Sequence, residues 1–149
     1  MNDMNKQELN DFFVDVFNLI LSKEEKIFDD TDYQDLTIKE CHVLESIHLL
    51  KEKNENKMTF IAKKLQISVG ALTTSIKTLM KKGYVERKVC SEDHRIIYID
   101  LTSKGEEANK LHLAFHDNLI DYITRTHSKE ELNSLTMCLK TFADFFKTI

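Results

Sequence analysis

The segment that decides the fold runs from Lys57 to Leu101 and reads KMTFIAKKLQISVGALTTSIKTLMKKGYVERKVCSEDHRIIYIDL. Its hydrophobic periodicity predicts a short amphipathic helix over residues 60–65 and a second one over about residues 69–82. The tight connection at residues 66–68 joins the two helices, and the second helix stops at Gly83. Two amphipathic helices in such close succession predict a helix-turn-helix.

Two strand-like runs follow at residues 84–90 and 96–101, with a polar tip at residues 91–95 between them. Helix, turn, helix and β-ribbon in this order form a winged helix-turn-helix, a module that reads DNA. We therefore expect a mainly α fold with a small β-wing. The winged helix-turn-helix should occupy about residues 37–101 of a single domain of residues 1–149, flanked by long helices.

The second helix of this segment has an apolar face and a face suited to DNA. Apolar residues at three- and four-residue steps are predicted to face the core: Val69, Leu72, Ile76, Leu79 and Met80. The opposite face is small, hydroxylic and cationic, with Gly70, Thr73, Thr74, Lys77 and Lys81. We predict major-groove contacts by Thr73, Thr74, Ser75 and Lys77, with Gly70 letting the backbone approach the DNA closely. Predicted phosphate contacts are Ser68 at the helix start, Lys63, Lys64, Lys81 and Lys88. An ordinary solvated helix face is the alternative.

Charge is distributed unevenly along the chain. Residues 57–95 carry nine lysine and arginine residues against three acids, a net charge of +6, whereas the whole chain has a net charge of −4. The remainder therefore totals −10. A basic centre within an acidic protein is the electrostatic footprint of a surface that binds nucleic acid. We expect double-stranded DNA as the partner.

Length and composition limit the other possibilities. The 149 residues amount to one domain, long enough for a hydrophobic core. No apolar run approaches the roughly 20 residues of a membrane span, and the N-terminus lacks a secretory pattern, so we expect no membrane partner. The widely spaced Cys41, Cys90 and Cys138 fit a reducing cytoplasm better than a disulfide framework, so the expected localisation is cytoplasmic.

Two helix starts carry the signature of a capping box, Thr37 with Glu40 and Ser128 with Glu131. They predict that the second helix begins after Thr37 and the last helix after Ser128. The acidic segment at residues 29–35 breaks the apolar period and predicts a loop between the first two helices.

The helices outside the central module are richly apolar. The first spans about residues 7–28, and a long helix after the cap Thr102 precedes the last one. Their apolar faces are broader than a surface helix needs, which predicts a bundle between two chains. We expect a homodimer, with dimerisation helices at about residues 5–28 and 103–148. Two reading helices would then lie roughly 34 Å apart on a palindromic operator. A self-contained monomer is the alternative.

Four short segments carry a family resemblance: residues 65–68, 82–87, 93–95 and 101–105. With the order of the helices, they resemble MarR-family repressors over nearly the whole chain. The resemblance implies that Asp93 orients Arg95, and that Arg95 enters the minor groove. A narrow A·T-rich minor groove has enhanced negative potential, which attracts an arginine. A surface ion pair at a hairpin turn is the alternative.

Three further pieces narrow the resemblance: residues 38–42, 69–75 and 111–116. They resemble the FabT-like branch of the family, which represses fatty-acid biosynthesis in Gram-positive bacteria. This implies that long-chain acyl-acyl carrier protein acts as co-repressor, and that no cofactor is required. The acyl chain would lie between the first, second and fifth helices, lined by Phe12, Phe13, Phe17, Val43, Ile47 and Phe115. Packed core is the alternative for these residues.

The histidines open a second interpretation. His112 and His116 are four residues apart on one helix face, a spacing that brings two imidazoles to one metal ion. The zinc-sensing branch of the MarR family uses a similar set, a carboxylate and three histidines. This implies a zinc-responsive repressor with Glu24, His42, His112 and His116 as ligands. Hydrogen-bonded packing of the histidine pair is the alternative.

The sequence offers no set of nucleophile, base and orienting residue, so we expect no enzyme. Cys41 and His42 suggest a thiol nucleophile, but neighbours in a helix point in different directions. A thiol-dependent enzyme is therefore a distant alternative. Cys90 would be a redox switch if Arg87 or Lys88 lowered its pKa, and a small buried thiol is the simpler interpretation.

Overall fold

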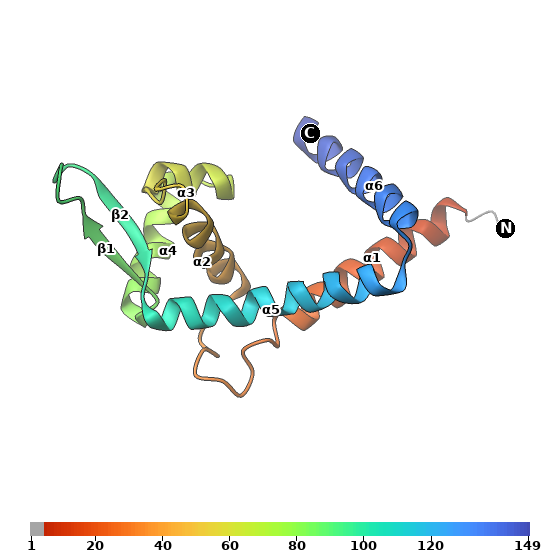
Figure 1. The fold of residues 1–149 in the computed structure, drawn as a ribbon, viewed down its shortest axis with the longest axis horizontal. Coiled ribbons are helices and arrows are strands. Elements are labelled where there is room, and N and C mark those ends of the chain that lie inside the picture. Colours follow the sequence, from red (N-terminus) through yellow and green to blue (C-terminus); the bar gives the residue numbers. More distant parts are fainter. Residues whose placement is uncertain (1–4) are drawn as a thin grey trace. The chain divides into compact units, whose positions relative to one another are not determined.

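The structure, a computed structural model, describes residues 5–149. Within them lie six helices and one two-stranded sheet (Figure 1), in the order α1 (Lys6–Glu24), α2 (Ile38–Lys51), α3 (Met58–Leu65), α4 (Val69–Lys82), β1 (Val85–Val89), β2 (Ile97–Leu101), α5 (Ser103–Thr126) and α6 (Lys129–Thr148). Two compact units divide the chain between His112 and Leu113, within α5. The first unit contains the winged helix-turn-helix, and the second contains the rest of α5 and α6. Residues 1–4 of the predicted domain lie outside the described residues.

The predicted mainly α fold with a small β-wing is confirmed, with differences at the ends of elements. α1 ends at Glu24 rather than near residue 28. The chain turns there because Phe28 is buried in the core and Asp30 adopts the left-handed conformation, with φ of 59°. Both strands begin one residue later than predicted, and α3 begins at Met58 rather than at residue 60.

Caps fix the helix boundaries that the sequence marks most clearly. Both predicted capping boxes form, so Thr37 begins α2 and Ser128 begins α6. Gly83 ends α4 in the left-handed conformation, with φ of 85°. These predictions of helix ends are confirmed.

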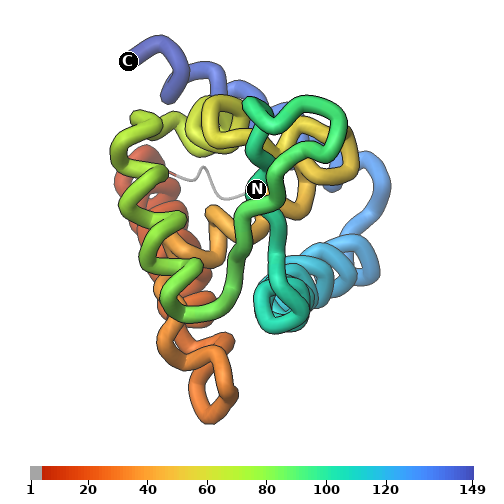
Figure 2. The backbone as a smooth tube through the Cα atoms, turned by 90° about the vertical axis from the view of Figure 1, so that its left-hand side faces the viewer, coloured from red at the N-terminus to blue at the C-terminus, as the bar shows by residue number. Residues whose placement is uncertain are grey.

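The core of the first unit surrounds α2, which packs against α3, α4 and β2. The least exposed side chains come from all of these elements and the start of the wing: Leu44, Ile47, Ile61, Leu72, Ile76, Leu79, Tyr84 and Ile99. Burial of their apolar surface is the main contribution that stabilises this unit. Figure 2 shows α4 passing through a tight turn into the β-hairpin. The buried residues of α4 and of the hairpin belong to the same hydrophobic cluster.

The β-hairpin is attached at its base to the loop that follows α2. β1 and β2 are antiparallel, in the register that places Val85 opposite Leu101. The buried Asn56 lies along the edge of β2 that faces away from β1. Its backbone carbonyl accepts a hydrogen bond from Ile99 N (2.8 Å), and its side-chain amide donates to Ile99 O (2.7 Å). The hairpin is therefore anchored at one end and carries the wing tip at the other.

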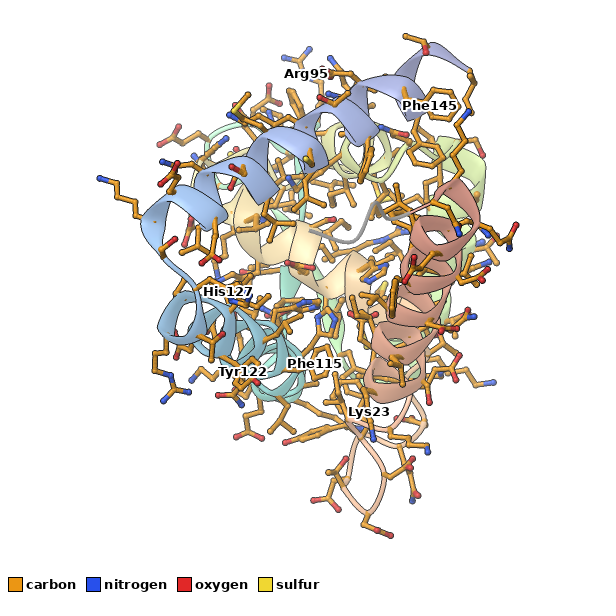
Figure 3. The ribbon with its side chains drawn as sticks, turned by 90° about the vertical axis from the view of Figure 1, so that its right-hand side faces the viewer. Lys23, Arg95, Phe115, Tyr122, His127 and Phe145 are labelled. Atoms are coloured by element: carbon orange, nitrogen blue, oxygen red, sulfur yellow. The ribbon has the colours of Figure 1, made fainter. Side chains whose placement is uncertain are left out.

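Two helices carry exposed apolar faces. The face on α1 comprises Leu9, Phe12, Phe13, Val16 and Phe17. The face on α6 comprises Met137, Leu139, Phe142, Phe145 and Phe146, and Figure 3 shows Phe145 on this helix. Large exposed apolar patches mark sites where a protein associates with another. None of the described helices combines the length and apolar character that a membrane span requires.

Candidate DNA-binding surface and effector site

The apolar side of α4 determines which side of this helix faces solvent. Leu72, Ile76 and Leu79 are fully buried, and Ser68 caps the helix by accepting a hydrogen bond from Ala71 N (3.1 Å). Of the predicted major-groove residues, Gly70, Thr74 and Lys77 are exposed on the opposite side, whereas Thr73 and Ser75 are half-buried beside the apolar stripe.

The prediction that Val69 and Met80 face the core was wrong. Their side chains are 46% and 38% exposed, whereas Leu72, Ile76 and Leu79 are fully buried. Successive helix residues are rotated by about 100°, so Val69 and Met80 lie at the edge of the apolar stripe and the core does not reach them.

The hydroxyl groups on the accessible side of α4 keep acceptor positions open. Thr73 Oγ1 donates to the Val69 carbonyl (2.8 Å), and Thr74 Oγ1 donates to the Gly70 carbonyl (3.4 Å). A hydroxyl that donates its proton to its own helix retains lone pairs for a donor such as the amino group of adenine or cytosine. A Cβ on Gly70 would meet nothing closer than 3.9 Å, so the fold itself does not require glycine there.

The predicted phosphate-contacting lysines differ in their surroundings. Lys63, Lys64 and Lys81 are exposed. Lys88 is held by two acids, because its Nζ lies 3.0 Å from Asp100 Oδ2 and 3.4 Å from Glu86 Oε1. Lys88 would therefore enter a DNA contact with its charge already partly neutralised.

The wing tip presents one braced cation. Asp93 accepts hydrogen bonds from the Arg95 backbone N (3.0 Å), Nε (3.1 Å) and Nη2 (3.1 Å). These hydrogen bonds hold the pKa of Asp93 below its ordinary value. The Arg95 side chain nevertheless remains 91% exposed. A guanidinium that is oriented before it meets DNA loses less conformational entropy on entering a narrow minor groove.

The C-terminal end of α4 is tied to the segment at residues 35–40. Lys82 Nζ donates to the Asp35 carbonyl (2.5 Å) and forms an ion pair with Glu40 (2.8 Å). The Tyr84 hydroxyl donates to the Asp35 carboxylate, and burial together with this hydrogen bond raises the pKa of Tyr84. Residues 35–40 therefore contact both the end of the reading helix and the start of the wing.

The same segment forms part of the wall of a cavity of about 690 Å³. The cavity is lined by Leu21, Glu24, Glu25, Phe28, Leu36, Thr37, Ile38, Lys39 and His42. Most of the lining surface is apolar, although the lining also includes two carboxylates at the end of α1 and the polar side chains of Thr37, Lys39 and His42.

The six residues predicted to line an acyl pocket do not line this cavity. Phe12, Phe13 and Phe17 are exposed on α1, Val43 and Ile47 are packed in the core, and Phe115 belongs to the second unit. The prediction used the core-facing side of α2, whereas the cavity follows the first turn of that helix and the end of α1.

Glu24, His42 and His112 form a cluster of potential metal ligands. Their ligand atoms all lie within 4.8 Å of one another. Glu24 Oε1 and His112 Nε2, both buried, are 3.3 Å apart, and the rings of His42 and His112 are 5.7 Å apart. One carboxylate and two imidazoles form a ligand set that suits zinc. Glu24 and His42 also line the cavity, whereas His116, the fourth predicted ligand, lies in the second unit and outside this cluster.

Cys41 does not fit a nucleophile. Its side chain is 1% exposed, and burial, together with nearby carboxylates, raises the pKa of its thiol to about 12. The reactive form of cysteine is the thiolate, and a thiol with this pKa is protonated at neutral pH. The geometry therefore gives no support to the thiol-dependent enzyme.

Residues 36–97 match the MarR family profile. The winged helix-turn-helix of this chain is thus similar to that of the MarR family. The structural similarity extends beyond this match. The crystal structure of Streptococcus pneumoniae FabT in complex with DNA superposes on this chain with a TM-score of 0.81 and 28% sequence identity, and the similarity covers 97% of this chain and 99% of that chain. The repressor AdcR of Streptococcus pyogenes has a TM-score of 0.65 and 26% identity, covering 93% of this chain and 97% of that chain.

A curated relative in Bacillus subtilis is the uncharacterized HTH-type transcriptional regulator YwaE. It is 30% identical over 89 residues, which cover 59% of this chain and 52% of YwaE. The chain spans about half or less of the length of the curated B. subtilis relatives that it matches.

The sequence reasoning missed the residues that attach the MarR-type wing and reading helix to the rest of the first unit: Asp35, Lys51, Asn56 and Asp100. The one signal for this group is Asp100, an acid within an otherwise apolar strand. An acid in such a strand is costly to bury without partners, so its presence indicates that cations lie nearby.

Proposed function

We propose that this protein is a homodimeric MarR-type transcriptional repressor, which reads DNA with α4 in the major groove and Arg95 in the minor groove. The observation that carries the proposal is the accessible side of α4 together with the braced wing tip, on a fold that matches FabT in complex with DNA. The exposed apolar faces of α1 and α6 support a second copy of the chain as partner. A two-fold dimer fits a palindromic operator.

The proposed effector is a long-chain acyl group on acyl carrier protein, with fatty-acid biosynthesis genes as targets. The support is the 28% identity with FabT over nearly the whole chain, together with the cavity. Its volume of about 690 Å³ is within the range of small-molecule sites, and Leu21, Phe28, Leu36 and Ile38 give it an apolar lining suited to an acyl chain.

DNA affinity measured by fluorescence anisotropy, in chelator, tests this effector. The probe is a duplex from the promoter of the fatty-acid biosynthesis genes, titrated with and without palmitoyl-acyl carrier protein. We expect the acylated carrier to tighten binding at least tenfold, about 1.4 kcal/mol. The carrier without an acyl chain is the control. Equal affinity with both carriers would remove the effector and leave the DNA-binding proposal intact.

A second candidate function, a zinc-responsive repressor, is favoured by the cluster of Glu24, His42 and His112. These residues come from α1, α2 and α5. A metal ion held by them would supply a link between three helices of the first unit, and could thereby favour one conformation of the regulator.

His42→Ala tests the metal site, because His42 is exposed and its loss should leave the core intact. We expect competition with a chromophoric chelator to show zinc affinity at least a hundredfold weaker than in the wild type, since one of three ligands is lost. His48→Ala is the matched control, because His48 is also on α2 but pairs with Glu106 (3.4 Å) outside the cluster. Equal zinc affinity in the wild type and in both variants would contradict a metal site at this cluster.

A further inference from the structure

A buried carboxylate lies at the base of the wing. Asp100 is 4% exposed, and its carboxylate pairs with Lys51 Nζ (2.8 Å) and Lys88 Nζ (3.0 Å) and accepts a hydrogen bond from Leu101 N (2.9 Å). Burial opposes ionisation of this carboxyl, but the hydrogen bonds from the two lysines outweigh it and lower its pKa. A buried charge is tolerated only where partners satisfy it, so Asp100 determines where these lysines lie.

The partners of Asp100 come from different elements of the first unit. Lys51 ends α2, and Lys88 belongs to β1. The neighbouring residue Ile99 is held by the two hydrogen bonds of Asn56. Two consecutive residues of β2 are thus attached to the end of α2 and its following loop, Asp100 by its ion pair with Lys51 and Ile99 by hydrogen bonds.

We propose that Asp100 is a positioning residue that determines the DNA specificity of the wing. It holds the base of the hairpin against α2, and so fixes the direction in which Arg95 is presented to DNA. It also neutralises Lys88, which would otherwise add a phosphate contact that carries no sequence information. The inference rests on the proposed minor-groove contact of Arg95.

Removal of the Asp100 charge is expected to change two affinities in opposite directions. Binding to the preferred sequence weakens, because the wing is no longer held in one orientation. Binding to unrelated DNA strengthens, because Lys88 loses the closer of its two acidic partners and keeps only Glu86 (3.4 Å). A residue that only stabilises the fold would weaken both affinities by the same factor.

Asp100→Asn tests this inference, because asparagine keeps the shape of the side chain and removes its charge. The probes are a duplex selected from a random library with the wild-type protein and a scrambled duplex of the same composition. We expect binding to the selected duplex to weaken about fivefold and the salt dependence of scrambled-duplex binding to steepen by about one unit, as for one added phosphate contact. Equal fold-changes for the two duplexes, or an unchanged salt slope, would overturn the proposal.

Lys88→Met is the matched control. It removes the lysine that Asp100→Asn would release, and it leaves the ion pair between Asp100 and Lys51 in place. Combined with Asp100→Asn, it should return the salt slope for scrambled DNA to the wild-type value.

If Asp100→Asn does not fold, Lys51→Met replaces it, because the Lys51 side chain is 49% exposed and its loss removes one attachment of the wing. It should weaken selected-duplex binding about twofold to fivefold without changing scrambled-duplex binding, whereas a purely structural role changes both.

A double-mutant cycle with Arg95→Ala separates failure of this inference from failure of the proposed function. Asp100→Asn should have no further effect on selected-duplex binding once Arg95 is absent, because it acts through the wing tip. Additive effects would overturn the positioning role. An Arg95→Ala variant with wild-type affinity would instead overturn the proposed minor-groove contact.

Discussion

Gly105→Ala is expected to lower the free energy of unfolding by about 3 kcal/mol. A Cβ on Gly105 would lie 2.1 Å from the carbonyl oxygen of Tyr84 and 3.3 Å from Leu101 Cβ. The Tyr84 carbonyl is backbone and already accepts a hydrogen bond from Thr102 N (3.0 Å), so it cannot move aside as a flexible side chain can. Either the start of α5 or the base of the wing must shift. Denaturant unfolding followed by circular dichroism measures the loss.

Gly70→Ala is the matched control for this prediction. A Cβ on Gly70 meets nothing closer than 3.9 Å, and alanine is favoured over glycine within a helix, so stability should rise by up to about 1 kcal/mol. If the bare backbone at Gly70 approaches DNA, the same variant should bind its operator more weakly although it is more stable. Equal destabilisation of the two variants would contradict the close contact at Gly105.

Arg95→Ala is expected to weaken operator binding at least tenfold, about 1.4 kcal/mol, when A·T pairs flank the site. The guanidinium is 91% exposed and braced by Asp93, so its removal takes away a preoriented cation without opening a cavity in the core. The thermal unfolding midpoint should therefore stay near that of the wild type. Fluorescence anisotropy with duplexes that differ only in their flanks measures the effect.

Lys77→Ala serves as the control for a cation outside the wing. Lys77→Ala should flatten the salt dependence of binding by about one unit. The loss of affinity that it causes should not depend on the sequence that flanks the site. A loss for Arg95→Ala that is the same with A·T and G·C flanks would show that Arg95 acts as a phosphate contact like this lysine.

The helix-turn-helix could be predicted because its signals are local. Ser68 and Gly83 fix the ends of α4 through groups within a few positions of themselves, and the capping box of Thr37 does the same for α2. The apolar period then assigns Leu72 and Ile76 to the core. A single sequence displays all of these signals.

The lining of the cavity and the attachment of the wing depend on contacts between distant segments, and these could not be predicted from local signals. The cavity exists because the chain turns after Glu24 to bury Phe28, which shortens α1. The spacing of the histidines on α5 predicts a pair from one helix, whereas the cluster joins His112 to Glu24 and His42 and leaves out His116. Glu24 and His42 are assigned only through the resemblance to the zinc-sensing branch. Composition likewise does not tell which lysine neutralises Asp100.

The contacts of Lys82 with Asp35 and Glu40 have a thermodynamic consequence. Residues 36–39 of the same segment line the cavity, so a ligand that displaces this wall also changes the free energy of holding α4 in place. Linkage makes such an effect reciprocal: the factor by which an effector changes operator affinity is the factor by which the operator changes effector affinity. Repressor molecules bound to an operator and repressor molecules free in solution would then have different affinities for a scarce effector. The number of operators in the cell would therefore influence how strongly the free repressor responds to a given effector concentration.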